Sequence, residues 1–232
     1  MSKKKLFYFK NNLSKLRKKI FKDYREENLS KIICSQMEKY GDFNEKKVIK
    51  ILDYGSGHNP ILIKKIIKRL KTKYKKKKFL AYCYDFYNKN ELKKMNNSYD
   101  IKFFKIETLQ KKESLKFNFC LIIDVLHHIG IKETNKISKI IKLLKKKSKI
   151  LIIKDHFQYG FFSNLSLILM DFVGNYGDNV KIPSIYFNIK TYDKFMSKLN
   201  LKEIKRINDK KYYRWYWFYF NSKKLQFISI LK

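Results

Sequence analysis

The sequence predicts an α/β fold in which a mostly parallel sheet carries helices on both faces. Two observations lead to this class. Short apolar segments typical of strands alternate with amphipathic segments typical of helices along most of the chain. Three of the apolar segments end in an aspartate that a turn follows, at Asp53, Asp85 and Asp124. Parallel sheets bind ligands at the carboxyl ends of their strands, so these positions are the first candidates for a site.

Seven segments are predicted as strands because they are short, apolar and bounded by turn residues. They are residues 48–53, 79–85, 101–106, 117–124, 148–156, 201–208 and 225–232. Amphipathic helices are predicted between them, at residues 61–70, 132–147 and 192–200. Residues 1–47 are basic and also have helical spacing, so we divide the chain into an N-terminal helical extension and one domain over 48–232.

The composition suits one such domain. The chain has 232 residues, of which 44% are hydrophobic, enough for a full core. Its formal net charge of +35 is compatible with nucleic acid or an anionic membrane as a partner. However, 50 of the 55 basic residues are Lys and only 5 are Arg, whose planar fork reads phosphates and bases. We therefore interpret the charge as a solvated lysine surface, with RNA as the second choice.

The cysteines and the apolar stretches indicate a cytoplasmic protein. The three cysteines lack C-x-x-C spacing, and Cys83 and Cys120 fall in predicted strands, where a thiol behaves as a small hydrophobe. The longest mostly apolar stretch, residues 161–173, is interrupted by Asn164 and Asp171 and is too short to span a bilayer. The first apolar run is too short for a signal peptide.

The turn after the first predicted strand has the most specific pattern. The sequence VIKILDYGSGHNP places Gly55 and Gly57 directly after the strand-terminal Asp53. Glycine lets the backbone approach a ligand closely, and the following helix offers its N-terminal N–H groups to an anion. The dinucleotide fingerprint G-x-G-x-x-G is incomplete because Pro60 stands at its sixth position. A nicotinamide-dependent oxidoreductase is therefore disfavoured, and a turn without any ligand is the simpler alternative.

The pattern Asp-x-Gly-x-Gly at a strand end resembles the first motif of class I S-adenosylmethionine-dependent methyltransferases. The resemblance implies that Asp53 lies near the ammonium group of the cofactor S-adenosylmethionine. It also implies that the backbone of Gly55, Ser56 and Gly57 lies against the methionine end. Asn59 stands where this family often has a third glycine. Asparagine tolerates positive φ better than most residues, so the loop is compatible with the motif.

Later strand ends fit the same family in the same order. Asp85, 28 residues beyond Gly57, is the acid that accepts the ribose hydroxyls, and a lysine-rich loop accounts for the long spacing. Glu107, after the third strand, matches the position that contacts adenine. The sequence IIDVLHHI around Asp124 resembles the fourth motif of small-molecule methyltransferases, where the strand end faces the methyl group, so Asp124 is expected to line the cofactor cleft.

The resemblance also implies details of the fold. It predicts a Rossmann-like sheet of seven strands, mostly parallel, with helices on both faces and the last strand antiparallel. N-terminal helices often cap the cofactor cleft in this family, so residues 1–47 are either such a cap or a layer packed on the sheet edge.

Residues 155–180 contain no Lys or Arg, in a chain where nearly one residue in four is basic. Either this stretch is a buried helix or it forms a wall of an apolar acceptor pocket at the carboxyl edge of the sheet. We expect both features together, and a small, apolar or lipid-like methyl acceptor.

The catalytic base is the least determined part of the site. Histidine suits proton removal near neutral pH, and His156 and His128 lie just beyond predicted strand ends. His156 lies beside the predicted acceptor wall, so it is the first candidate, with Asp171 and Asn175 as pocket partners. Strand alternation turns Asp155 away from it. A metal site at His127 and His128 is disfavoured, because adjacent histidines do not readily share one ion and no third ligand has suitable spacing.

Two other functions remain open. An RNA methyltransferase is the alternative favoured by the net charge and by Trp215 and Trp217, which could stack on bases. A non-catalytic nucleotide-binding module of the same fold is the other. The sequence does not determine the oligomeric state.

Overall fold

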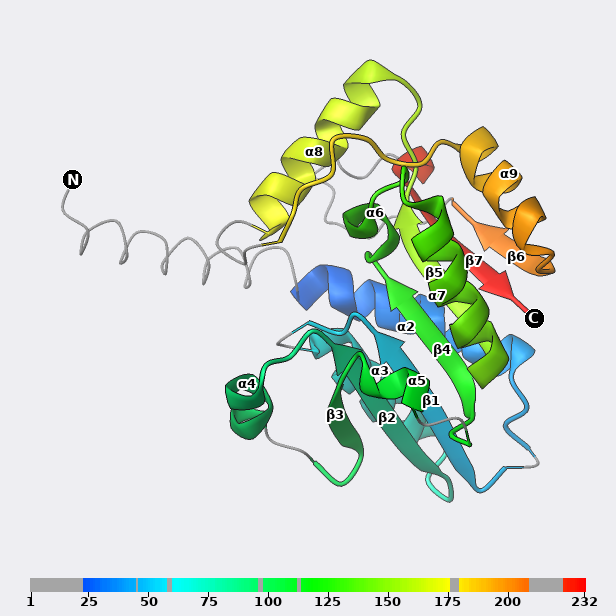
Figure 1. Ribbon diagram of the computed structural model, residues 1–232. Helices are drawn as coiled ribbons and strands as arrows, with labels where there is room; N and C mark the ends of the chain where they lie inside the picture. The colour runs from blue at the N-terminus through cyan, green and yellow to red at the C-terminus, as the bar shows by residue number, and fades with distance from the viewer. Residues whose placement is uncertain are drawn as a thin grey trace.

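The computed structural model describes residues 23–44, 46–57, 60–95, 98–111, 114–175, 180–208 and 223–232. Seven strands form one sheet in the order β3-β2-β1-β4-β5-β7-β6 (Figure 1). Their bounds are β1 Val48–Tyr54, β2 Lys78–Asp85, β3 Ile101–Lys105, β4 Phe117–Ile123, β5 Ser148–His156, β6 Glu203–Ile207 and β7 Gln226–Leu231. Each predicted strand is present, with ends that differ by up to two residues from those expected.

The strand pairing confirms the Rossmann-like prediction. Strands β3, β2, β1, β4 and β5 pair in parallel, whereas β7 is antiparallel to both β5 and β6. The chain order reverses between β1 and β4, which both pair along their carboxyl-terminal halves, Ile51 facing Phe119 and Tyr54 facing Ile122. Such a reversal opens a crevice at the carboxyl edge, where sheets of this class bind ligands.

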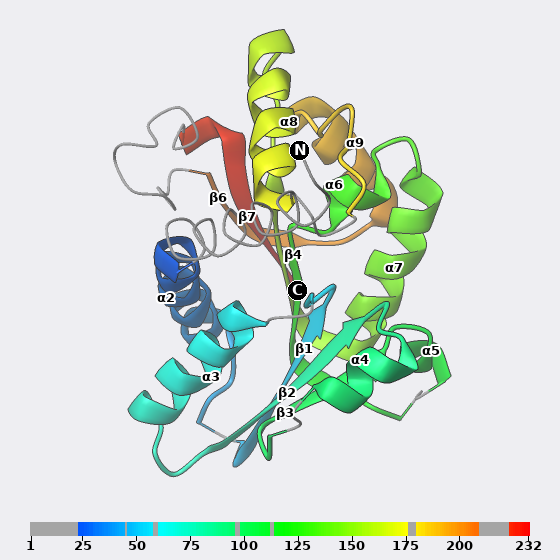
Figure 2. The same ribbon diagram turned by 90° about the vertical axis from the view of Figure 1, so that its left-hand side faces the viewer.

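Helices cover both faces of the sheet. Two pack on one face, α2 (Asp23–Tyr40) and α3 (Ile61–Lys73), and three lie on the other, α4 (Lys89–Lys94), α5 (Thr108–Lys111) and α7 (Thr134–Lys147) (Figure 2). The remaining helices are α6 (Leu126–Ile129), α8 (Phe161–Asn175), α9 (Ile189–Leu199) and the 3-10 turn η3 (Lys223–Leu225). Helix α8 projects beyond the carboxyl ends of β4 and β5, on the side of the expected cleft (Figure 1).

Strand alternation divides the core into two layers. Ile51 packs in the layer under α2 and α3, and its neighbour Leu52 packs in the layer under α7 and α9. The two predicted strand cysteines, Cys83 and Cys120, are buried thiols as expected.

The second half of the N-terminal extension is helical as predicted. Helix α2 packs on α3 through the buried residues Leu29, Ile33 and Met37, which recur every four residues on one helix face. The earlier helical segment of the extension lies outside the described residues. The division of the chain at residue 47 stays a prediction.

The lysine-free stretch forms α8, and its two faces differ. Leu167 and Asp171 are buried, whereas Phe161 is 76% exposed, Phe162 is 81% exposed and Leu169 is 50% exposed. A wholly buried helix is therefore wrong. One face of α8 packs inward and the other presents apolar side chains to solvent, and its role as a wall of an acceptor pocket stays a prediction. No described helix has both the length and the apolarity needed to cross a membrane.

Candidate functional site

The two glycines of the turn after β1 have positive φ angles. Gly55 has φ +76° and Gly57 has φ +68°, both in the left-handed region that favours glycine. A Cβ atom on Gly55 would lie only 2.5 Å from Cγ2 of Val125, in the turn after β4. The absence of a side chain at Gly55 therefore lets the turns after β1 and β4 meet at the carboxyl edge.

Asp85 lies directly against this turn despite the long spacing in sequence. The Gly57 N–H donates to Asp85 Oδ2 at 2.6 Å, and the Phe86 N–H donates to Oδ1 at 2.7 Å. The Tyr87 hydroxyl holds the same turn, because it donates to the Gly57 carbonyl at 2.7 Å and lies 2.6 Å from Ser56 Oγ. The structure thus brings the predicted ribose acid and the predicted glycine turn together.

Asp53 is a buried acid at the end of β1, only 6% exposed. Burial, followed by the nearby carboxylates of Asp85 and Glu26, raises the pKa of Asp53 to about 7. Burying an ionised carboxylate without a positive partner costs free energy. A cationic group bound beside Asp53 would favour its ionised form, so the position is suited to an ammonium ligand.

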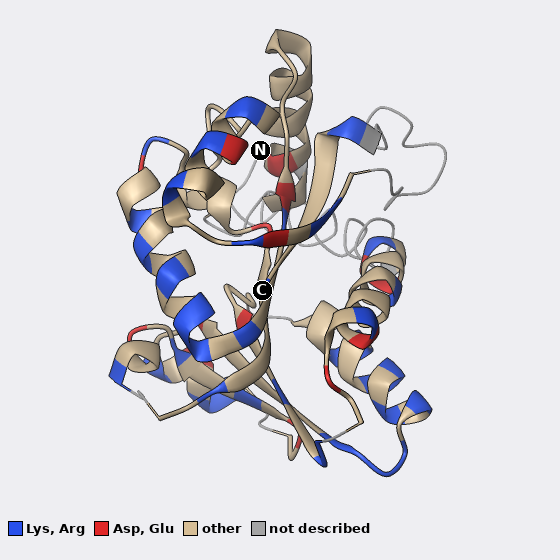
Figure 3. Ribbon diagram, turned by 90° about the vertical axis from the view of Figure 1, so that its right-hand side faces the viewer, with Lys and Arg blue, Asp and Glu red and all other residues tan. Residues whose placement is uncertain are grey.

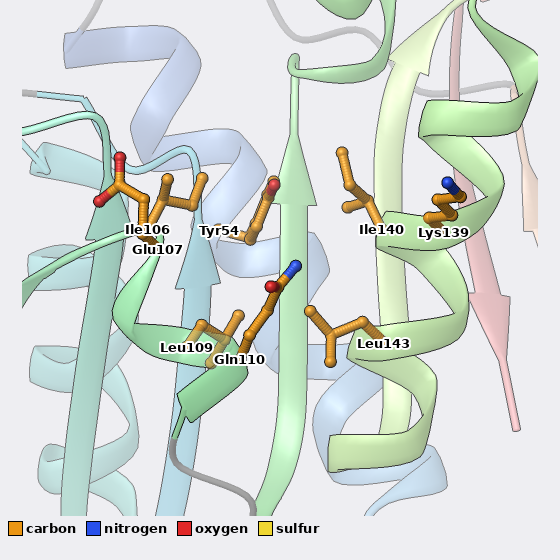
Figure 4. A pocket seen from close by; sticks show the side chains of 8 residues that line it. All are labelled: Tyr54, Ile106, Glu107, Leu109, Gln110, Lys139, Ile140 and Leu143. Carbon is orange, nitrogen blue, oxygen red and sulfur yellow. The ribbon is translucent and has the colours of Figure 1, made fainter.

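Glu107 is exposed just beyond β3, at the edge of a half-open cavity of about 210 Å³ (Figure 4). The lining residues are Tyr54, Ile106, Glu107, Leu109, Gln110, Lys139, Ile140 and Leu143. In Figure 4 the Glu107 carboxylate points away from the other lining side chains. Pockets for whole drug-sized ligands are typically about 300–1,000 Å³, so this cavity suits only a part of a cofactor.

Asp124, at the end of β4, holds a cluster of three basic side chains. It has φ +55°, unusual for a residue other than glycine. Its carboxylate forms an ion pair with Arg25 of α2, accepts a hydrogen bond from Lys154 Nζ at 2.5 Å and lies 3.3 Å from His156 Nε2. Burial opposes ionisation, but Arg25 and Lys154 outweigh it and hold the pKa of Asp124 well below its usual range. We call these four residues the Asp124 cluster.

His156 is the residue of the Asp124 cluster that can accept a proton. Burial, followed by the Lys154 charge, lowers the pKa of His156, which favours the neutral imidazole at pH 7. With Nε2 directed at Asp124, its Nδ1 is buried and has no hydrogen-bond partner among the described residues. The register of β5 on β4 places Lys154 beside Ile123 and thus His156 beside the turn at Asp124, while Asp171 as a pocket partner of His156 stays a prediction.

Asp171 belongs to a second, neighbouring cluster around His127. His127 Nδ1 lies 2.6 Å from Asp155 Oδ1, and His127 Nε2 lies 3.1 Å from Asp171 Oδ2. The Tyr186 hydroxyl donates to Asp171 Oδ2 at 2.5 Å. Burial disfavours a charged His127, but Asp155 and then Asp171 outweigh it and raise the pKa of His127 to about 10. We call His127, Asp155, Asp171 and Tyr186 the His127 cluster.

His128 lies beside the His127 cluster, with its ring centroid 4.0 Å from that of His127. Its Nδ1 lies 3.0 Å from the Lys181 carbonyl oxygen, and burial, followed by His127, lowers its pKa. Asn175 ends α8 half-buried, and within the described ranges no hydrogen bond connects it to His128 or His156.

Sequence reasoning missed three of these residues. Lys154 is fully buried in β5, and a lysine inside a run of buried strand residues was the available signal, since lysine is seldom buried without a partner. His127 was interpreted as a turn residue. Nothing in the local sequence distinguishes Arg25 from the other basic residues of the extension.

No family model and no curated protein matches the sequence. Solved structures do match the fold. A cyclopropane-fatty-acyl-phospholipid synthase-like protein from Lactobacillus casei superposes with a TM-score of 0.55 at 10% identity, over 90% of either chain. A SAM-dependent methyltransferase from Archaeoglobus fulgidus gives a TM-score of 0.50 at 12% identity, over 88% of this chain and 94% of that one. Loganic acid methyltransferase with SAH gives 0.53 at 11% identity, over 90% and 94%.

These matches span nearly the whole of each chain, and the strand order and the antiparallel β7 agree with the expectation from the sequence motifs. At 10–12% identity they establish the architecture. The chain has the fold of the class I S-adenosylmethionine-dependent methyltransferases.

Proposed function

We propose that this protein is an S-adenosylmethionine-dependent methyltransferase that acts on a small, apolar or lipid-like acceptor. The observation that carries the proposal is the contact between the glycine turn and Asp85, beside the buried Asp53. A methionine-binding turn and a ribose-binding acid have to be neighbours to hold one cofactor. Similar solved structures support the same cofactor, because they include a SAM-dependent methyltransferase and a methyltransferase bound to SAH.

The cofactor would lie across the carboxyl ends of β1, β2 and β3. Asp53 would meet the ammonium group, and the backbone of Gly55, Ser56 and Gly57 would approach the methionine end. Asp85 accepts two backbone hydrogen bonds, and a carboxylate offers about four acceptor sites, so it retains capacity for the ribose hydroxyls. Glu107 would lie next to the adenine.

Methyl transfer is an in-line displacement at the cofactor sulfonium, so the protein mainly positions and desolvates the reactants. The acceptor oxygen, nitrogen or carbon attacks the methyl carbon, the sulfur–carbon bond breaks, and S-adenosylhomocysteine leaves. If the acceptor carries a proton, a base must remove it. We propose His156 Nδ1 as that base, with Asp124 fixing the ring through Nε2. His128 is the alternative base.

The acceptor side is proposed from α8. This helix contains no Lys or Arg and presents Phe161, Phe162 and Leu169 to solvent, whereas the neighbouring helices α7 and α9 carry many basic residues (Figure 3). Aromatic and aliphatic side chains beside the cleft favour an apolar acceptor. Asp171 and Asn175, on the same helix, are the proposed polar groups of the acceptor site.

Methyl-labelled S-adenosylmethionine tests the acceptor class. The purified protein is incubated with cell extract, which is then separated into RNA, protein and organic-soluble small molecules. We expect label in the organic-soluble fraction, and metabolite profiling of that fraction would identify the acceptor. Label in RNA, with binding that weakens steeply with salt, would contradict the acceptor class. Cofactor binding without transfer to any fraction would favour the non-catalytic module.

The base is tested with His156→Gln and His128→Gln once an acceptor is known. Loss of general base catalysis costs about 10²–10⁴-fold in turnover. We expect this loss for His156→Gln, with cofactor affinity unchanged, because His156 contacts Asp124 and not the glycine turn. If only His128→Gln loses turnover, the base is His128.

A further inference from the structure

Three side chains next to the Asp124 cluster converge in a way that methyl transfer does not require. His127, His128 and Asp171 each offer one potential metal ligand atom, and these atoms lie within 4.8 Å of one another. His127 and Asp171 are buried and His128 is half-buried. His127 Nε2 lies 3.1 Å from Asp171 Oδ2 but is not engaged in a hydrogen bond with any described group. The buried ring nitrogen and the carboxylate thus face each other at a distance that either a proton or a metal ion could bridge.

A hydrogen bond at the second ring nitrogen fixes each of the two histidines. His127 Nδ1 is bound by Asp155 Oδ1 at 2.6 Å, and His128 Nδ1 is bound by the Lys181 carbonyl at 3.0 Å. Both rings therefore keep Nε2 as the free ligand atom. Metal-binding histidines almost always have their second nitrogen fixed by a carboxylate or carbonyl, which sets the tautomer and orients the ring.

Asp155 and Asp171 are fixed just as firmly. Asp155 Oδ2 accepts hydrogen bonds from the backbone N–H groups of Leu126 and His127, so the acid that orients His127 is itself locked in place. The Tyr186 hydroxyl donates to Asp171 Oδ2, which leaves further lone pairs of that carboxylate available.

We propose that His127 Nε2, His128 Nε2 and the Asp171 carboxylate bind one divalent transition-metal ion, with zinc as the best fit. Two imidazoles and one carboxylate suit zinc or a neighbouring transition metal, whereas magnesium and calcium prefer oxygen ligands alone. The two imidazole rings would be neutral ligands, and the ion would balance the negative charges of the Asp155 and Asp171 carboxylates. Three protein ligands leave a fourth position for water or a substrate group.

The sequence argument against a metal was that adjacent histidines do not share an ion and have no third ligand. The short helix α6 places both rings 4.0 Å apart, and the third ligand comes from α8, far along the chain. A bound ion would therefore also tie α8 to the turn after β4.

A different trio, His127, Asp155 and His156, is also close enough to hold an ion. It is less suited, because both Asp155 oxygens already accept hydrogen bonds and His156 Nε2 is directed at Asp124. This trio provides the matched control, since His156 is a buried histidine next to the proposed site but outside it.

The test uses the full chain after removal of metal with a chelator. Calorimetry with Zn²⁺ is expected to show one ion per chain, and Co²⁺ is expected to give the visible absorption of a tetrahedral site that Zn²⁺ then displaces. His128→Gln and Asp171→Asn should each weaken binding at least 10-fold, and His156→Gln should bind as the wild type does. Zn²⁺ should also raise the melting temperature of the wild type.

Absence of stoichiometric binding to the wild type would overturn the proposal and leave His127 as an imidazolium between two carboxylates. Loss of binding in His156→Gln with retention in His128→Gln would assign the ion to the other trio and also overturn it. If Asp171→Asn does not fold, the half-buried His128 decides the outcome alone. The proposal goes beyond methyl transfer, and none of these measurements requires the methyl donor.

Discussion

The two sides of β5 carry buried clusters with opposite electrostatics. Lys154 and His156 point to one side, where they meet Asp124 and Arg25. Asp155, between them, points to the other side, where it meets His127, whose other ring nitrogen faces Asp171. The first cluster has Arg25 and Lys154 for one carboxylate, although burial lowers the pKa of Lys154, and the second has two carboxylates for the His127 imidazole.

This difference shows how one strand can prepare two kinds of site a few ångströms apart. Alternation directs Lys154 and Asp155 to opposite faces of the strand, and the two clusters meet only where the His156 ring lies 5.1 Å from that of His127. The Asp124 cluster keeps its histidine neutral and available to accept a proton, whereas the His127 cluster favours a cation. This contrast is consistent with the proposals of proton transfer at the first cluster and ion binding at the second.

Asp155→Asn should have the largest effect on stability. The Asp155 carboxylate accepts from three backbone N–H groups and pairs with His127 in a fully buried place. Breaking a buried ion pair costs about 3–5 kcal/mol, and we expect the free energy of unfolding to fall by that amount in urea denaturation at pH 7. Asp100→Asn, which removes a more exposed pair with Lys71, should cost at most about 1 kcal/mol. Equal losses for the two variants would contradict the comparison.

The pH dependence of stability should be the next largest effect. The pKa of His127 is about 10 in the folded protein and 6.5 in the unfolded chain, so the protonated ring stabilises the fold fully below pH 6.5. As pH rises above 6.5 the unfolded chain loses this proton first, and the free energy of unfolding should fall by about 1 kcal/mol per pH unit.

Urea denaturation of metal-free protein between pH 7.5 and 8.5 measures this slope, because Asp53, with a pKa of about 7, is largely ionised there. His127→Gln removes the titrating group, so its stability should be nearly flat over the same range. The same slope in both proteins would show that His127 is not charged in the fold.

Lys154→Met should have a smaller effect than Asp155→Asn. Methionine fills most of the buried volume of the lysine chain, and Asp124 keeps Arg25 and His156 as partners. We expect a loss of at most about 2 kcal/mol in the free energy of unfolding, since an apolar replacement avoids the cost of burying the ammonium group. The pKa of His156 should rise when the neighbouring cation is removed, which NMR titration of its ring protons measures. An unchanged pKa of His156 in Lys154→Met would show that the Lys154 charge does not act on His156.

The smallest predicted effect concerns the cofactor end of the sheet. The pKa of Asp53 is about 7, and an ammonium ligand favours its ionised form. Affinity for S-adenosylhomocysteine should therefore rise by up to about 10-fold per pH unit below pH 7 and level off above it. Asp53→Asn should bind more weakly and lose most of this dependence. If the affinity of Asp53→Asn for S-adenosylhomocysteine still depends on pH, a group other than Asp53 is the one that titrates.

The cofactor half of the site was predictable from the sequence, and the β5 half was only partly so. The turn at Gly55 and Gly57 needs its glycines for backbone reasons, and Asp85 ends the strand that pairs with β1, so both leave a local signal. The partner of His156 depends on the register between β4 and β5. No local pattern encodes that register, so Asp124 could not be identified from the sequence as a partner of His156. Strand alternation predicted correctly that the Asp155 side chain points away from that of His156. It could not identify His127 as the partner of Asp155.

The measurement that tests the central claim most directly is calorimetry with S-adenosylhomocysteine, compared with NAD. We predict one molecule of S-adenosylhomocysteine bound per chain and no binding of NAD. Asp85→Ala should weaken that binding strongly, whereas Asp100→Ala, which removes an acid outside the glycine turn, should leave it unchanged. Failure of the wild type to bind S-adenosylhomocysteine, or equal affinity in Asp85→Ala, would contradict the placement of the cofactor at the carboxyl ends of β1 and β2.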